Sequence, residues 1–286
     1  MFNEFPDSIE FPLGNGVDRL VSWMLATFSG IFDGIADIVR WMVLNLESGL
    51  TWLPWPFVLA VIAVGAWFST KSKLTTLVLV ALMFMVGTFG LWSLAMITLA
   101  IIFTSAIISI LIGLPIGILV ARSPTFAAVA KPILDGMQTM PAFVYLIPAM
   151  FFFGLGVVSA VFATIIYAVP PLIRLTDLGI RGVSGSAIEA ATAYGANPRQ
   201  ILREVQLPLA LPAIMAGINQ MTMMALAMVV ISSMIGARGL GQEVLLSINR
   251  LDIGRGAEAG LAIVAIAIII DRITQGFAKR YEESIA

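Results

Sequence analysis

The chain has 286 residues, of which 59% are hydrophobic and only 12% are charged. Soluble domains carry roughly 25% charged residues, about twice the fraction found here. Because the mean hydropathy is also high, at +1.00, an ordinary soluble protein is excluded. The absence of cysteine excludes disulfides and thiolate metal sites, and the absence of histidine removes the commonest metal ligand and general base. The net charge of −1 gives no indication of nucleic-acid binding.

Residues 1–50 are predicted to form an extracytoplasmic N-terminal segment that contains an amphipathic helix. Apolar residues recur there at alternating steps of four and three from Val17 to Met42, which is the period of one helix face. Five charged residues between positions 18 and 40 argue against a membrane span, while Trp23 and Trp41 suit the depth of lipid headgroups. We therefore expect an interfacial helix on the outer leaflet; packing on the protein's own spans is the alternative.

Four long stretches without Asp, Glu, Lys or Arg indicate membrane-spanning helices, because a span needs about 20 mostly apolar residues. They are residues 48–70, 74–121, 136–173 and 205–237. Glycine-containing breaks divide the stretches 74–121 and 136–173 into two spans each. Together with a span near the C-terminus, this predicts about seven spans, at 52–69, 74–91, 94–120, 137–153, 157–174, 209–235 and 257–276. The last span is interrupted by Asp271 and Arg272, an adjacent acid and base that can pair or extend to the interface. The sequence therefore predicts an all-α polytopic membrane protein.

The basic residues are distributed unequally between the two sides that these spans define. Eleven of the 16 Lys and Arg residues lie on one side, and the other five lie on the opposite side. Because cytoplasmic loops carry the excess of positive charge, we expect the C-terminus in the cytoplasm, with residues 277–286 as a cytoplasmic tail. Seven spans then place the N-terminus outside.

The longest cytoplasmic segment, residues 174–206, shows signals for two short helices. Ser186 can cap the first helix with Glu189 as its capping-box partner, and Gly195 can end it after Tyr194 by taking the left-handed conformation. The first helix is rich in alanine, and such small residues permit close approach by another surface. It is therefore either a projection on which a partner docks or an ordinary loop helix folded on the bundle.

The second short helix is predicted to begin at Asn197. This residue can act as the N-cap, and Pro198 occupies the first helical position, where a missing N–H costs nothing. Leu207-Pro208 is expected to close the segment before the sixth span.

Glu189-Ala190-Ala191, Gly195, Val205 and Leu207-Pro208 stand at the spacing of the EAA signature. The chain thereby resembles the permeases of binding-protein-dependent ABC importers, although the family's usual isoleucine is Val205 here. The resemblance implies a five-helix type I permease domain at 93–276, with a coupling loop at 175–208 whose helix docks on an ATP-binding subunit. Residues 51–92 are then two accessory spans. The residues to which the resemblance assigns ATPase coupling are Glu189, Ala190, Ala191, Gly195, Leu207 and Pro208.

The resemblance also implies the partners of the chain. They are an ATP-binding cassette subunit that binds ATP and Mg, an extracytoplasmic substrate-binding protein, a second and identical permease copy, and membrane lipid, with no nucleic acid. The sequence lacks the GxxxxGK phosphate loop followed by Ser or Thr, so we expect no cofactor in this chain and no enzymatic activity of its own. The expected location is a bacterial or archaeal plasma (inner) membrane.

A finer resemblance concerns the segments 138–156, 167–181, 239–256 and 268–275. They look like the glycine betaine/proline betaine branch of these permeases, which implies import of quaternary-ammonium osmoprotectants. Another small solute, such as choline, carnitine or an amino acid, is the main alternative. An ATP-independent secondary carrier is disfavoured because such carriers typically carry charged coupling residues within their spans. A membrane enzyme is disfavoured because paired intramembrane carboxylates and histidine are lacking.

Aromatic and methionine side chains of the spans are candidates for the translocation path. Aromatic faces attract a quaternary ammonium by cation–π contact, and methionines form an adaptable lining. Packing against lipid or neighbouring helices is the alternative for each of them. The candidates are Met140, Phe143, Tyr145, Met221 and Met224.

Overall fold

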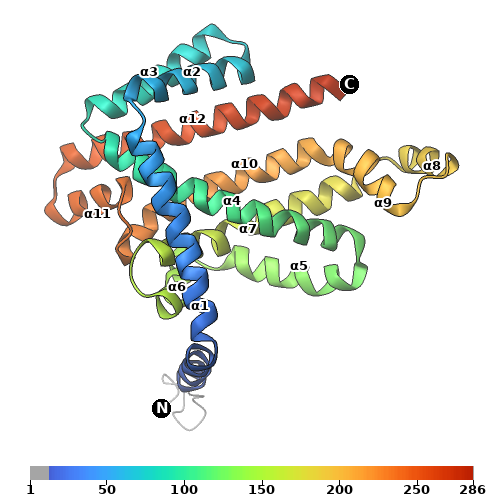
Figure 1. Ribbon diagram of the computed structural model, residues 1–286, viewed down its shortest axis with the longest axis horizontal. Helices are drawn as coiled ribbons and strands as arrows, with labels where there is room; N and C mark the ends of the chain where they lie inside the picture. The colour runs from blue at the N-terminus through green and yellow to red at the C-terminus, as the bar shows by residue number, and fades with distance from the viewer. Residues whose placement is uncertain (1–12, 286) are drawn as a thin grey trace, which may run out of the picture.

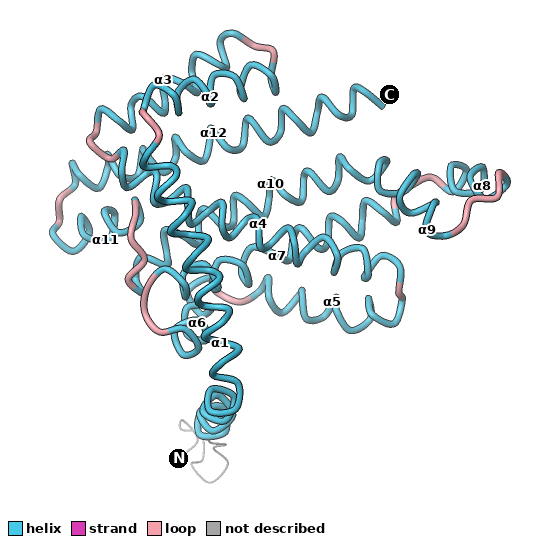
Figure 2. The backbone as a smooth tube through the Cα atoms, viewed as in Figure 1, coloured by secondary structure: helices cyan, strands magenta, loops and turns pink. Residues whose placement is uncertain are grey.

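The computed structural model describes residues 13–285, and helices dominate this part of the chain (Figures 1 and 2). Within the described residues there is no β-strand, so the all-α prediction is confirmed. Most of the long helices run roughly along one direction in Figure 1, and the short helices α6 and α11 lie at the end of the bundle opposite α8.

Helix α1 (Leu13–Trp52) is longer than the predicted amphipathic helix and crosses the other long helices (Figure 1). It bends at Phe28, whose backbone leaves helical geometry at φ −117° and ψ 20°. Val39 and Val43 are buried in the main core, whereas Ile31 and Ile38 of the predicted apolar stripe are exposed. The helix thus packs on the bundle through one face and leaves much of the predicted stripe free for lipid.

Helices α2 (Trp55–Thr70) and α3 (Lys73–Thr88) form a hairpin that packs on α12 (Ile253–Ile285). The hairpin turn begins at Lys71, which takes the left-handed conformation (φ 55°). Ser72 then caps α3, because its Oγ accepts a hydrogen bond from the Thr75 N–H at 3.3 Å. These helices correspond to the two predicted accessory spans.

The bundle is built around α4 (Trp92–Arg122), α7 (Val157–Arg181) and α10 (Leu207–Ile231). Gly117 of α4 faces Thr176 of α7 so closely that an added Cβ would lie 2.6 Å from the Thr176 Cβ. Small residues allow such close approach between membrane helices. Gly179 of α7 meets Ala213 of α10 in the same way, at 2.8 Å.

The predicted span 137–153 is wrong as a continuous helix. Helix α5 (Pro124–Thr139) ends there, and a 3₁₀ turn (Ala142–Tyr145) and α6 (Leu146–Phe153) follow at an angle of 112°. Pro141 causes the break, because it disfavours helical geometry at the preceding Met140, whose backbone is extended (φ −71°, ψ 137°).

The expected break at Leu207-Pro208 is also wrong. The helix runs without interruption from Pro198 to Ile235, through α9 (Pro198–Gln200), a π-helical turn (Ile201–Gln206), α10 and a 3₁₀ turn (Ser232–Ile235). In the π-helical turn the Leu207 N–H donates to the Leu202 carbonyl five residues back. Such widening lets the helix accept Pro208, which has no N–H to donate.

The two helices α7 and α10 are joined at both ends. At one end the segment with α8 (Gly185–Ala193) connects them, and at the other the Gly156 N–H donates to the Ile235 carbonyl at 2.9 Å. Helix α11 (Leu240–Arg250) then leads from this second end into α12.

By length and composition, five described helices could cross a membrane, or six if the bent pair α5–α6 is one span. The five are Gly14–Trp52, Trp92–Arg122, Val157–Arg181, Pro198–Ile235 and Ile253–Arg280. Helices α2 and α3, with 16 residues each, are shorter. The count of seven spans is therefore not confirmed. Apart from the broken span 137–153, a helix does occupy every position at which a span was predicted.

Candidate functional site

Helix α8 projects beyond the end of the bundle, past the ends of α7 and α9 (Figure 1). All of its residues are exposed or half-buried, and its packing is against the π-helical turn Ile201–Gln206. Glu189 and Ala190 are exposed, and Ala191 is half-buried. The structure thus favours a projecting helix over a loop helix folded on the bundle.

The predicted start of this helix is wrong by two residues. Ser184 is the N-cap and Gly185 is the first helical residue, so Ser186 lies within the first turn. A helical Ser186 cannot cap the N–H of Glu189, and its Oγ instead donates to the Ser184 Oγ at 3.4 Å. The predicted capping box between Ser186 and Glu189 is therefore absent from the described structure.

The end of the helix is as predicted. Gly195 takes the left-handed conformation (φ 84°), and the Ala196 N–H donates back to the Ala191 carbonyl at 3.0 Å. This pattern ends helices with a glycine because other side chains are strained at positive φ. The sharp stop turns the chain back toward the bundle.

The start of the second short helix is also confirmed. The Asn197 Oδ1 accepts from the N–H groups of Arg199 and Gln200, each at 3.0 Å, and the Gln200 side chain accepts from the Asn197 N–H at 2.9 Å. This reciprocal capping box fixes the return path from α8 into the long helix. Leu207 and Pro208 are half-buried at the base of the projection.

Tyr194 is a candidate docking residue that sequence reasoning missed. Its relative exposure is 94%, and it lies at the tip of α8 directly before Gly195. A large aromatic side chain gains much from burial in a partner's pocket. Its place next to the glycine stop of a projecting helix was the signal in the sequence.

The candidate path residues fall into three environments. Met140 and Phe143 lie at the α5–α6 break and are exposed, at 41% and 59%. Tyr145 is buried, with its hydroxyl donating to the Met137 carbonyl and its ring centroid 5.8 Å from that of Tyr167.

The third environment is the packed interface between α7 and α10. Met221 is fully buried there with Ala168 and Leu172, and Met224 is half-buried against the same cluster. The structure thus brings Met221 and Met224 together, but not with Met140 and Phe143.

Asp271 in α12 accepts hydrogen bonds from one residue of α10 and from one of its own helix. Its Oδ1 accepts from the Asn219 Nδ2 of α10 at 3.0 Å and from the Gln275 Nε2 at 2.6 Å. The predicted pairing with Arg272 is longer, at 4.0 Å. The acid is thus satisfied by amide donors.

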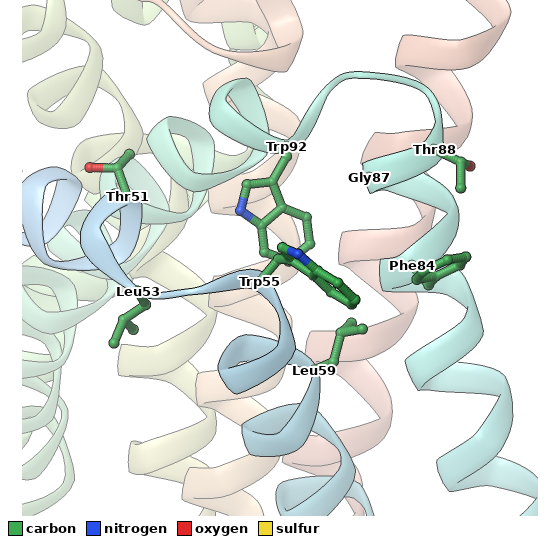
Figure 3. Close-up of a pocket in the computed structure, with 8 residues that line it drawn as sticks. All are labelled: Thr51, Leu53, Trp55, Leu59, Phe84, Gly87, Thr88 and Trp92. Atoms are coloured by element: carbon green, nitrogen blue, oxygen red, sulfur yellow. The ribbon is translucent and has the colours of Figure 1, made fainter.

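Figure 3 shows a cavity of about 560 Å³ at the ends of α1 and α3 and the starts of α2 and α4. It is lined by the aromatic residues Trp55, Phe84 and Trp92, together with two leucines, two threonines and a glycine. The Trp55 and Phe84 ring centroids lie 6.3 Å apart. Such a cluster is typical of the aromatic belt at a membrane interface.

Long apolar helices packed through small residues, with one alanine-rich helix projecting from the end, define a polytopic membrane protein. Residues 113–283 match the family described as "Binding-protein-dependent transport system inner membrane component". The chain belongs to this family, and it is a permease subunit of an ABC importer rather than an enzyme.

Three curated relatives cover most of the chain. The glycine betaine/proline betaine transport system permease protein ProW of Escherichia coli is 47% identical, over 92% of this chain and 74% of the relative. The glycine betaine transport system permease protein OpuAB of Bacillus subtilis is 47% identical, over 92% and 93%. The glycine betaine/carnitine transport permease protein GbuB of Listeria monocytogenes is 44% identical, over 96% and 98%.

A solved structure shares the fold. It is an inward-facing conformation of the MetNI methionine ABC transporter, with a TM-score of 0.60 and 23% identity. The match covers 64% of this chain and 92% of that chain.

Proposed function

We propose that this chain forms the translocation path of an ATP-driven importer of quaternary-ammonium osmoprotectants, such as glycine betaine and proline betaine, and couples that path to ATP hydrolysis by a partner subunit. The observation that carries the coupling is the projecting helix α8, in which Glu189 and Ala190 of the EAA segment are exposed. The names of the relatives, which specify glycine betaine transport, support the substrate class.

The docking surface for the ATP-binding subunit consists of Glu189, Ala190, Ala191 and Gly195, with Tyr194 at its tip. The alanines permit close approach of a partner backbone, and Glu189 supplies an exposed charge at the rim. Leu207 and Pro208 lie where the projection joins the long helix, so they transmit displacement of α8 to α10.

The translocation path runs past the break between α5 and α6. Non-helical backbone at membrane depth is tolerated only where protein buries it or where it lines a water-filled cavity. The exposure of Met140 and Phe143 beside this break favours the second case. Their side chains offer an aromatic face and a polarisable lining to a quaternary ammonium without binding it tightly.

The working assembly contains two copies of this permease. One projecting helix engages one ATP-binding subunit, so a paired ATPase requires two such helices related by two-fold symmetry. ATP and Mg belong to the ATP-binding subunits, and an extracytoplasmic binding protein delivers the solute. The side that carries α8 faces the cytoplasm of a bacterial or archaeal cell, with the C-terminus inside and the N-terminus outside.

Reconstitution in liposomes tests this function. Radiolabelled glycine betaine uptake should require this chain, the ATP-binding subunit, the binding protein and ATP together. Competition by unlabelled choline, carnitine and proline betaine ranks the alternative solutes. Robust uptake by this chain alone, without ATP, would mean a secondary carrier and would contradict the proposal.

A further inference from the structure

Asp177 is a buried carboxylate that belongs neither to the docking surface nor to the proposed path. It lies on α7 one turn before that helix ends at Arg181, and its relative exposure is 7%. Burial of an ionised carboxylate is costly unless the group is both paired and hydrogen-bonded. The groups that pair with the Asp177 carboxylate therefore indicate its role.

Both carboxylate oxygens of Asp177 have a cationic partner. The Arg181 Nε donates to Oδ1 at 2.5 Å, and the Lys131 Nζ of α5 lies 3.1 Å from Oδ2. Arg181 also donates through Nη2 to the Val120 carbonyl near the end of α4, at 2.6 Å. One carboxylate thus links α4, α5 and α7 at the end of the bundle that carries α8.

This link lies between the docking helix and the candidate path. Three residues, from Gly182 to Ser184, separate Arg181 from the first residue of α8. In the other direction, α5 continues from Lys131 to the break at Met140, nine residues or about 13 Å along a helix. Displacement of the end of α7 therefore reaches the break if α5 moves with it.

Apolar packing alone does not fix α5 lengthwise against α7. Ala127 and Leu134 of α5 pack on Val169 and Ile173 of α7, but apolar attraction is non-directional and allows sliding. The Lys131–Asp177 pair is directional, because two charged atoms must stay within hydrogen-bond distance. It therefore constrains the register between the two helices.

We propose that Asp177 is a positioning residue for transport, which makes α5 follow the end of α7 when α8 is displaced. The inference rests on the proposed function, because it assigns to α8 the role of receiving motion from the ATP-binding subunit. In this scheme Asp177 contributes to the ratio of solute transported to ATP hydrolysed, rather than to docking or to ATP hydrolysis itself.

The chain contains a matched control in the Arg174–Asp135 ion pair, which also joins α7 to α5. The two pairs differ in the burial of the carboxylate: the Asp135 side chain is 64% exposed, whereas that of Asp177 is 9% exposed. The two cations are both at least partly exposed, Arg174 at 38% and Lys131 at 53%. Exposed pairs contribute little because water competes for the charges. Asp135→Asn therefore removes one carboxylate from the same two helices without changing a buried one.

The test compares Asp177→Asn, Lys131→Met and Asp135→Asn in the complete transporter, reconstituted with its ATP-binding subunit and binding protein. Betaine uptake and ATP hydrolysis are measured in the same proteoliposomes. We expect Asp177→Asn and Lys131→Met to lower the uptake per ATP at least about fivefold, and Asp135→Asn to stay within about twofold of the unmodified complex.

Lys131→Met keeps the test decisive if Asp177→Asn fails to assemble, because it leaves Asp177 paired with Arg181. The inference is overturned if Lys131→Met hydrolyses ATP and shows the same uptake per ATP as Asp135→Asn. Where Asp177→Asn assembles, it must show that same uptake per ATP as well. In that case the unmodified complex still shows ATP-driven uptake, and the proposed function stands. ATP-independent uptake by the unmodified complex would instead overturn the proposed function and this inference with it.

Discussion

At the scale of single residues, two kinds of glycine contribute to this molecule for different reasons. Gly195 is needed for its backbone, because it adopts φ 84° at the end of α8. Gly117 is needed for its small size, because the Thr176 side chain occupies the space that a Cβ would take. Substitution at the first should disturb coupling, and substitution at the second should disturb stability.

Gly195→Val should leave the chain inserted and folded but lower ATP-driven uptake by at least about fivefold. A β-branched residue at this positive φ costs about 1–3 kcal/mol locally, which reshapes the end of the docking helix. Uptake and co-purification of the ATP-binding subunit measure the effect.

Gly185→Val is the matched control, because Gly185 is exposed at the other end of α8 and an added Cβ meets open space among the described residues. Normal transport by Gly195→Val would refute the coupling role of the stop. Poor insertion of that variant would equally count against it, because the argument requires an inserted chain.

At the scale of the elements, local chemistry explains what could be predicted. The backbone preferences of Gly195 and Asn197 depend on the nearest few residues, so their roles in helix ending and capping were readable from sequence. Pro141 signalled a break, but hydropathy alone treated the region as one span, and the angle of 112° depends on packing.

The buried partner of Lys131 could not be read from the sequence, because Asp177 lies 46 positions further along the chain and on another helix. The same holds for the pairing of Asn219 with Asp271. The candidate residues for the translocation path do not lie together in the structure, for a related reason. Hydropathy marks methionine and aromatic residues as apolar, but it does not tell whether they face another helix, as Met221 does, or a surface, as Phe143 does.

Close packing of α4 on α7 should be sensitive to one methyl group. Gly117→Ala places a Cβ 2.6 Å from the Thr176 Cβ and 3.0 Å from the Ile173 carbonyl, so we expect it to destabilise the chain by about 1–3 kcal/mol. Gly260→Ala on α12 meets open space among the described residues and should be neutral or slightly stabilising. Melting temperatures of the purified variants in detergent compare the two, and equal values would contradict this packing.

At the scale of the whole molecule, the two ends of the bundle have different characters. One end carries α8 and the α4–α5 turn, and the other carries α6 and α11, with α1 crossing the bundle (Figure 1). The proposed orientation assigns the first end to the cytoplasm. This assignment follows from the distribution of Lys and Arg along the sequence.

The absence of cysteine makes the orientation directly testable. Thr125→Cys, in the first turn of α5, should react with a membrane-impermeant maleimide only after the cells are permeabilised. Asn249→Cys, near the end of α11, should react in intact cells, and both positions are exposed in the structure. The reverse pattern would invert the topology and move α8 away from any cytoplasmic ATPase.

The closure of α7 and α10 at both ends has a mechanical consequence. The segment with α8 ties the two helices at one end, and the Gly156–Ile235 hydrogen bond ties them at the other, so the pair resists shear and should rotate as one rigid frame. Helix α7 has 25 residues. A tilt of about 10° over its length of about 37 Å displaces one end by roughly 6 Å relative to the other, close to one helical turn. Displacement of α8 should therefore move the end of this helix pair at the opposite face of the membrane at the same time.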